Sequence, residues 1–239
     1  MEPAISLASP YTCPSGEGET SLVAQRFNGL YPLSSYNFLH KPTVVQRCRD
    51  KTIDKTLNLA ICAITAVYFS KHGAERDAWI RMSERLILDR LEQPSIFQLQ
   101  ASLLVIRYRV TMGQLSRAFM MAGLAGRWAA ALRLNYEHSG LRLAAQEIRR
   151  TFWSSHLLDG NFSSELKGYE LFHPDTIHLQ LPCEEIDFTE ELVVNTGYLH
   201  SDKGLGPRAI SLHAASVTFA FIRRVLECMR MNFFTVDTV

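Results

Sequence analysis

The sequence predicts an all-α protein, an array of packed helical hairpins, on three observations. Apolar residues recur at helical spacing over 36–162 and again over 209–233. The alternation of apolar and polar residues that marks strands is nearly absent, and the best strand candidate, 191–194, is poor. A content of 47% hydrophobic and 21% charged residues is that of a chain able to bury a sizeable core.

Each helix of the array follows from local spacing and from the residues at its ends. Pro42 suits the first turn of a short helix, and Ser95 followed by Gln98 has the spacing of a capping box. Gly113 is placed to end the helix that Ser95 begins. Helices are therefore expected over residues 42–50, 53–70, 74–92, 95–113, 114–134, 143–162 and 209–233.

Small residues set the 114–134 helix apart from the others. Its alanines and glycines would let neighbouring backbones approach closely, so we expect this helix to be central and heavily packed. The pair Gly123 and Gly126 is interpreted as packing rather than phosphate binding, because no strand precedes it.

Two regions are expected to lack regular structure. Residues 1–35 combine prolines with a stretch rich in Gly, Ser, Thr and Glu. They are expected to form a flexible N-terminal arm, or one that becomes ordered only on contact, rather than a core element. Residues 172–207 contain Pro174, Pro182 and Pro207 and are expected to be mostly irregular loops. The remainder of the chain, 36–239, is expected to be one helical domain.

Charge and cysteine content argue against several classes of protein. Lys and Arg number 25 against 24 Asp and Glu, a net charge of +1. The basic doublets Arg149-Arg150 and Arg223-Arg224 are too few and too far apart to form a DNA-binding element. The longest apolar run, 57–69, is too short to span a bilayer, so no membrane association is expected. The cysteines are Cys13, Cys48, Cys62, Cys183 and Cys228. Because no pair of them forms a CxxC unit, neither a zinc module nor a disulfide framework is predicted. Cys62 is expected to be a buried thiol.

The sequence carries no familiar catalytic motif, and no catalytic residue, cofactor or metal is assigned from it. His173, Asp175 and His178 could form a two-His, one-carboxylate site, but a solvated loop is the better interpretation. The acidic cluster over 184–191 could bind a basic partner, and is interpreted instead as a solvated face.

A series of phrases resembles the fungal-specific transcription-factor domain, the middle homology region of zinc binuclear-cluster regulators. The most specific phrase is Glu-x-Arg-Arg-Thr-x-Trp from Glu147 to Trp153, with Asp159 six residues further on. The Gln-Ala-x-Leu stretch from Gln100 and the Leu-Pro-Cys phrase at 181–183 also match. The resemblance runs from about Tyr36 to at least Phe188, which is most of the chain.

The signature residues that this resemblance singles out are Glu147, Arg149, Arg150, Trp153 and Asp159. We expect them to fasten the helical core rather than to line a ligand pocket. Glu147 and Arg150 have the spacing of a local ion pair, whereas Arg149 and Asp159 are too far apart to pair and are expected to meet neighbouring helices. Trp153 is expected to be buried against the 114–134 helix.

The sequence departs from the family in three ways. The N-terminal six-cysteine zinc cluster, with its basic linker and coiled coil, is missing from these residues, and the turn that follows Asp159 differs. The family's domain also tends to continue further, so the helical domain is expected to be shortened at its C-terminus. Direct, specific DNA binding is therefore not expected.

The resemblance implies a regulator that senses a ligand or partner, acts in the nucleus and pairs with a protein partner or with a second copy. A small-molecule ligand and a link to a secondary-metabolite gene cluster are part of this hypothesis. The alternative is a cytoplasmic enzyme of a fungal biosynthetic pathway, a cofactor-free cyclase or pericyclase, since such catalysis needs only a shaped pocket and a few hydrogen-bond donors. A truncated gene product without independent function is a third hypothesis.

Overall fold

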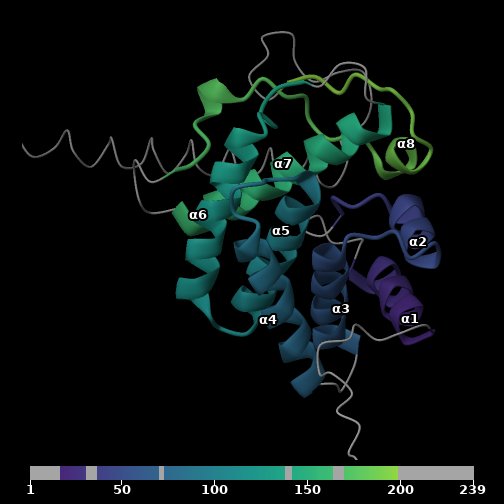
Figure 1. The fold of residues 1–239 in the computed structure, drawn as a ribbon. Coiled ribbons are helices and arrows are strands. Elements are labelled where there is room, and N and C mark those ends of the chain that lie inside the picture. Colours follow the sequence, from purple (N-terminus) through teal and green to yellow (C-terminus); the bar gives the residue numbers. More distant parts are fainter. Residues whose placement is uncertain (1–16, 31–36, 70–72, 138–141, 164–169, 199–239) are drawn as a thin grey trace, which may run out of the picture.

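The computed structural model describes residues 17–30, 37–69, 73–137, 142–163 and 170–198 (Figure 1). Within these ranges the fold is all-α, as predicted, with no strand and only two isolated β-bridges. The predicted helix over 209–233 lies outside the described residues. The elements are α1 (Glu17–Gln25), a π-helical turn (Arg26–Leu30), α2 (Lys41–Arg49), α3 (Lys55–Phe69), α4 (Gly73–Asp89), α5 (Ile96–Thr111), α6 (Leu115–Ala131), α7 (Arg142–Ser163), a 3-10 turn (Pro174–Thr176) and α8 (Glu185–Thr189).

The centre of the fold is α3, which is buried around its whole circumference from Thr56 to Ala66. It packs against α4, α5 and α1, and α5 in turn packs against α6 and α7. Figure 1 shows α3 to α6 standing side by side, with α7 crossing above them. A helix that is apolar on all sides belongs in the interior, and the sequence of α3 has this property.

The prediction that the small-residue helix is the central one is wrong. One face of α6 is buried, at Ala118, Ala122, Ala125 and Ala129 among others, but Leu115, Phe119 and Met120 are exposed. The small residues do allow a close approach, since a Cβ at Gly126 would lie 2.5 Å from Leu171 Cδ1. At Gly126 the partner is thus a side chain of the segment after α7.

The predicted flexible arm is wrong for residues 17–30, which form α1 and the π-helical turn. Leu22, Val23, Phe27 and Leu30 are buried, and α1 packs against α3. Gly29 permits this packing, because a Cβ there would lie only 2.1 Å from the ring of Phe69. The composition of the segment concealed an apolar stripe at helical spacing.

The predicted ends of α5 are confirmed. The hydroxyl of Ser95 accepts a hydrogen bond from the backbone N–H of Gln98 at 3.3 Å, as an N-cap residue does. The Gln98 amide does not complete a capping box, because it donates to the carbonyl of Arg90 at 3.4 Å. Gly113 follows the C-terminus with a φ of 72°, a conformation that favours glycine.

The poor strand candidate at 191–194 forms no strand, and residues 170–198 are irregular apart from the 3-10 turn and α8. The described part of the predicted irregular region thus agrees with the prediction. We call residues 170–198 the strap. Figure 1 shows it running over the top of the molecule from α7 to α8, which lies beside α2. The short helix α8 is not among the predicted elements. It lies within the acidic cluster over 184–191, which was interpreted as a solvated face.

A buried ion pair joins three of the helices. Glu84 of α4 is 2% exposed and contacts the buried guanidinium of Arg109 on α5. The same carboxylate accepts a hydrogen bond from Arg117 of α6 at 2.6 Å, and Arg109 donates to Gln114 at 2.6 Å. This network fixes the relative position of α4, α5 and the start of α6 where their apolar contacts alone would permit sliding.

Glu84→Gln is expected to lower the free energy of unfolding by about 1–3 kcal/mol, because the charge of the buried Arg109 loses its counter-charge. Arg117→Ala is the matched control, since the Arg117 side chain is 57% exposed and such a pair contributes about 0–1 kcal/mol. Urea denaturation of both variants measures the difference. Equal effects of the two substitutions would contradict the assignment of the buried pair as the main contributor.

Candidate functional site

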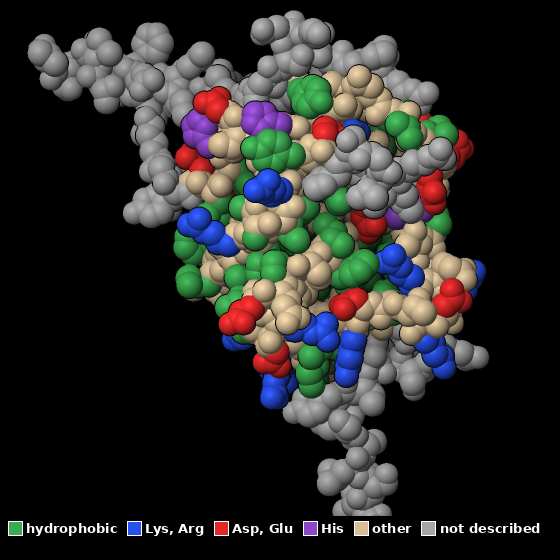
Figure 2. Space-filling model, turned by 45° about the horizontal axis from the view of Figure 1, so that its top comes forward, with side chains coloured by type: hydrophobic (Ala, Val, Ile, Leu, Met, Phe, Trp, Pro, Cys, Tyr) green, Lys and Arg blue, Asp and Glu red, His purple; other side chains and the backbone are tan. Residues whose placement is uncertain are grey.

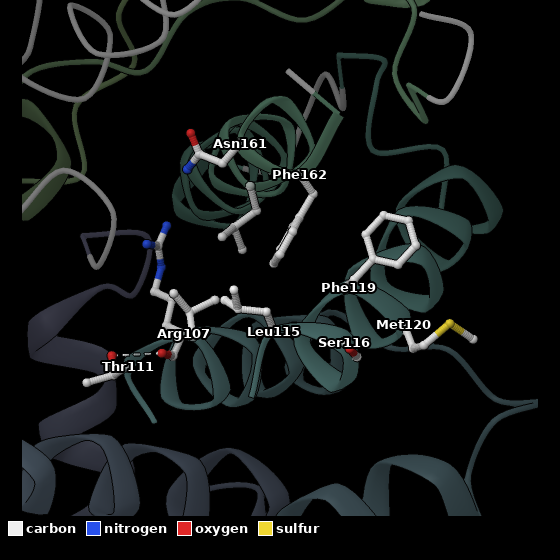
Figure 3. A pocket seen from close by; sticks show the side chains of 10 residues that line it. Arg107, Thr111, Leu115, Ser116, Phe119, Met120, Asn161 and Phe162 are labelled. Atoms are coloured by element: carbon white, nitrogen blue, oxygen red, sulfur yellow. Dashed lines mark hydrogen bonds between the residues drawn. The ribbon is translucent and has the colours of Figure 1, made fainter. Parts of the chain in front are cut away.

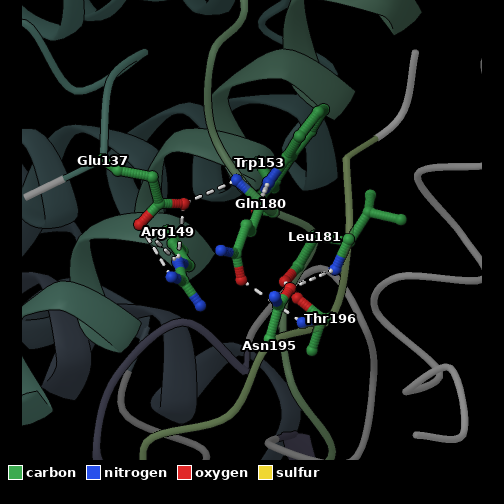
Figure 4. A network of polar contacts seen from close by, with 8 residues as sticks. Glu137, Arg149, Trp153, Gln180, Leu181, Asn195 and Thr196 are labelled. Atoms are coloured by element: carbon green, nitrogen blue, oxygen red, sulfur yellow. Dashed lines mark hydrogen bonds and ion pairs between the residues drawn. The ribbon is translucent and has the colours of Figure 1, made fainter. Parts of the chain in front are cut away.

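The signature residues all lie on α7. The side chains of Arg149, Arg150, Trp153 and Asp159 meet the strap or other loop segments, whereas Glu147 meets α5. Figure 4 shows part of this network, in which Arg149 and Trp153 approach the strap around Gln180. The resemblance singled out the α7 residues of these contacts. Their partners are Asn37, Glu137, Gln180, Cys183, Glu185, Leu171 and Phe172.

Arg150 is the most heavily engaged of the signature residues. Its side chain is fully buried and donates to the backbone carbonyls of Asn37 and Cys183, both at 2.9 Å. It also donates to a carboxylate oxygen of Glu185 at 2.6 Å, and its guanidinium lies 4.0 Å from the ring centroid of Phe188. One side chain of α7 thereby holds the segment before α2, the Leu-Pro-Cys phrase and α8 together.

The predicted ion pair between Glu147 and Arg150 is wrong. Arg150 pairs with Glu185, and Glu147 accepts a hydrogen bond from the Gln100 amide of α5 at 2.9 Å. The spacing of three residues permits a pair along the helix, but tertiary partners compete for both groups. Burial raises the pKa of the Glu147 carboxyl, and its hydrogen bond with Gln100 opposes that shift.

Arg149 forms a second anchor with Glu137, which follows α6. The guanidinium donates two hydrogen bonds from Nε and one from Nη2, the shortest at 2.7 Å. Glu137 also accepts from the backbone N–H of Gln180 at 2.6 Å, so the pair orients the strap as well as α7. Such two-pronged contacts combine charge with fixed geometry.

Trp153 and Asp159 bind the strap through its backbone. Trp153 is fully buried, as predicted, and its indole N–H donates to the carbonyl of Gln180 at 2.8 Å. Asp159 accepts from the backbone N–H groups of Leu171 and Phe172 at 3.0 and 3.3 Å. The expected partners of Arg149 and Asp159, neighbouring helices, are thus replaced by loops.

Aromatic rings of α7 itself surround Trp153. Its observed ring contacts are with Phe152 and His156 on its own helix, both at 5.5 Å between centroids. Leu171, not Trp153, occupies the space at Gly126 on the small-residue helix. Phe172 completes the packing, with its ring 5.1 Å from that of Phe152.

The histidine and acidic candidates are placed as follows. His173 and Asp175 are exposed, with His173 Nδ1 3.5 Å from Asp175, whereas His178 stacks on Tyr136. The described residues include no group of His, Cys, Asp and Glu that could hold a metal ion. In the acidic cluster, Glu185 pairs with Arg150 and Asp187 is buried, so the interpretation as a wholly solvated face is wrong.

The cysteines within the described ranges are buried and unbridged. They are Cys48, Cys62 and Cys183. Cys62 is fully buried, as predicted, and the carbonyl of Cys183 serves the Arg150 anchor. Cys13 and Cys228 lie outside the described residues.

An apolar groove of about 700 Å³ opens between α5, α6 and α7. Figure 3 shows Phe162 reaching from α7 toward Leu115 and Phe119 of α6, with Arg107 and Asn161 at one side. The rings of Phe119 and Phe162 meet edge to face at 6.0 Å between centroids. The sequence did not indicate this groove, because it arises where exposed residues of different helices converge.

Glu147→Gln is expected to raise the free energy of unfolding at pH 7.5, with a smaller gain at pH 5. A carboxyl whose pKa is raised by folding favours the native state at low pH, and this contribution is lost as the pH rises through the folded pKa. The amide keeps an acceptor for Gln100 without a buried charge. Urea denaturation at the two pH values measures the gain, with the exposed Glu92→Gln as the control for the loss of one negative charge. A lower stability at both values would contradict the prediction.

The structure defines an all-α domain in which one long helix, α7, carries buried anchors for a loop segment. The family model of the fungal specific transcription factor domain matches residues 26–231. The chain belongs to this family. The match begins inside the region predicted to be a flexible arm, where the structure has α1 and its π-helical turn.

The relatives of the chain are fungal transcription regulators. An uncharacterized transcriptional regulatory protein of Schizosaccharomyces pombe is 30% identical over 179 residues, covering 66% of this chain and 18% of the relative. The Zn(2)-C6 fungal-type transcription factors FTF1a and FTF2 of Fusarium oxysporum are each 29% identical, over 72% and 71% of this chain and 18% of each relative. The chain thus spans about a fifth of the length of the curated relatives that it matches. No solved structure matches.

Proposed function

We propose that the chain is the regulatory domain of a fungal transcription regulator, acting in the nucleus through a protein partner or a second copy, without specific DNA binding of its own. The observation that carries this proposal is the family match over 26–231, which contains the anchors of α7. A signal from a small-molecule ligand and a role in a secondary-metabolite gene cluster belong to the same proposal.

The surface charges bear on the part of the proposal that excludes specific DNA binding. On the face that Figure 2 shows, Lys and Arg side chains alternate with Asp and Glu, and no broad basic area appears. Specific DNA binding requires several phosphate contacts from a concentrated basic element. No helix within the described ranges has the length and hydropathy needed to cross a membrane.

A tethering experiment tests the proposed function. The 239-residue chain is fused to a heterologous DNA-binding domain in a fungal reporter strain, and reporter transcription is expected to change several-fold relative to that DNA-binding domain alone. Arg150→Met should reduce the change, because the strap loses its anchor on α7. The exposed substitution Val193→Ala is the control. Unchanged transcription with a stably expressed, nuclear fusion would overturn the proposal.

The purified chain is expected not to shift DNA specifically at physiological salt. The reason is its near-neutral charge of +1 and the absence of a CxxC pair. A gel shift with nanomolar protein on random and promoter-derived duplexes measures this. A sequence-dependent shift that survives physiological salt would contradict the prediction, and turnover of a biosynthetic intermediate by the same preparation would support the enzyme alternative instead.

A further inference from the structure

The apolar groove between α5, α6 and α7 leaves several large apolar side chains exposed to solvent. Leu115, Phe119 and Met120 on α6 are 58%, 45% and 71% exposed, and Val110 on α5 is 40% exposed. These residues line one continuous hollow with Phe162. Apolar side chains gathered in this way mark a surface that binds another element.

The shape and chemistry of the groove suit an amphipathic helix. Residues of all three helices form its walls (Figure 3). Most of the lining is aliphatic and aromatic, and its polar members are Arg107, Thr111, Ser116 and Asn161. An amphipathic helix binds such a groove through apolar residues at spacings of three and four. Leu158, which is buried, closes the floor.

The chain itself contains a segment with the required pattern. Over 209–233, which lies outside the described residues, an apolar stripe recurs at spacings of three and four: Ile210, Ala214, Val217, Phe221 and Val225. Ser216, Arg223, Glu227 and Arg230 lie on the other side of the same helical wheel, which also carries Leu212 and Phe219. The family match extends to residue 231 and so places this segment in the same domain as the groove.

The segment can reach the groove from the end of the strap. Tyr198 forms a bridge with Gln180, whose carbonyl binds Trp153 of α7. The groove residues 158–162 follow Trp153 along α7 by roughly 8–14 Å at the helical rise. Residues 199–209 can span roughly 36–40 Å when extended, which leaves ample slack.

We propose that the apolar groove is the docking site of the chain's own 209–233 helix, with Phe221 at the centre of the contact. An intramolecular helix has the advantage over a second copy, because its tether gives an effective concentration that reaches roughly the millimolar range. Docking would cover Leu115, Phe119 and Met120, the exposed large apolar side chains of α6. This proposal goes beyond the regulatory function and does not depend on it.

Photo-crosslinking of the full 239-residue chain tests the proposal. The change Phe119→p-benzoylphenylalanine keeps an aromatic ring at the groove, and irradiation is expected to join position 119 to residues within 209–233 in the monomer fraction, as mapped by mass spectrometry. The same probe at Tyr136, an aromatic residue of similar exposure at 48%, is the control and should not label that segment.

A second pair of variants identifies the face that docks. Phe221→Asp is expected to reduce the yield of the crosslink at least fivefold, whereas Ser216→Asp on the other side of the helical wheel should leave it unchanged. Crosslinks that join two chains would overturn the proposal in favour of a second copy. Labelling confined to other segments, or no labelling of 209–233, would also overturn it.

Discussion

Arg150→Met is expected to lower the free energy of unfolding by about 2–5 kcal/mol and to release the strap from α7. The methionine has a comparable length but no donors, so the buried carbonyls of Asn37 and Cys183 lose their hydrogen-bond partner. Each unsatisfied buried group of this kind costs about 1–3 kcal/mol. Glu185 contributes less, because its side chain is 48% exposed and can return to water.

Urea denaturation measures the loss, and hydrogen exchange locates it. Exchange of backbone amides around 181–188 should accelerate more than exchange in α3, since the anchor holds the strap rather than the centre of the fold. Glu185→Gln is the matched control and should cost less than about 1 kcal/mol, because it removes only the half-exposed partner. An Arg150→Met variant as stable as the parent would contradict the proposal that the signature residues are fasteners.

Trp153→Ala is expected to cost about 3–5 kcal/mol, or to give insoluble protein, because it leaves a cavity where a fully buried indole lay. Domains of ordinary stability have roughly 5–15 kcal/mol in total. For a domain of this size, such a loss corresponds to a fall in Tm of roughly 6–20 °C. The variant also leaves the carbonyl of Gln180 without its indole donor.

Trp153→Phe distinguishes the effect of the cavity on stability from the effect of the lost hydrogen bond. It retains most of the ring volume and removes the N–H, so its loss of stability should be intermediate between that of the parent and that of Trp153→Ala. Ile186→Ala, at a residue that is 61% exposed, is the control for the loss of an apolar side chain and should have little effect. Thermal melts of the purified variants decide the matter. A Trp153→Ala variant with unchanged Tm would favour a pocket-lining role over a fastening role.

Local rules predicted most of the helices, because their signals lie within one or two turns. Ser95 caps α5 and Gly113 ends it through contacts and dihedral angles that neighbouring residues decide. The same rules overlooked α1, where the Pro- and Gly-rich composition concealed the stripe of Leu22, Val23 and Phe27. Burial against α3 stabilises that segment, and the composition of a segment does not reveal such packing.

The sequence predicted the α7 residues of the candidate site but not their partners. The resemblance singled out Arg149, Arg150 and Trp153, whereas their partners carry no local signal. Glu137 and Gln180 lie in segments that look like ordinary solvated loops, and their roles depend on the course of the strap over α7. The pairing of Glu147 with Arg150 failed for the same reason, because helical spacing shows which groups can meet but not which competitors are closer.

The sequence by itself determined the all-α class, most helix boundaries, the burial of Trp153 and the family, since periodicity, capping and motif spacing are short-range properties of the chain. Only the tertiary structure decided that α3 rather than α6 is central, that the strap is the partner of α7, and that a groove opens beside Phe119. These features join residues far apart in the chain. Their energies depend on competition among buried polar groups and packed side chains, which is settled only when the whole fold brings them together.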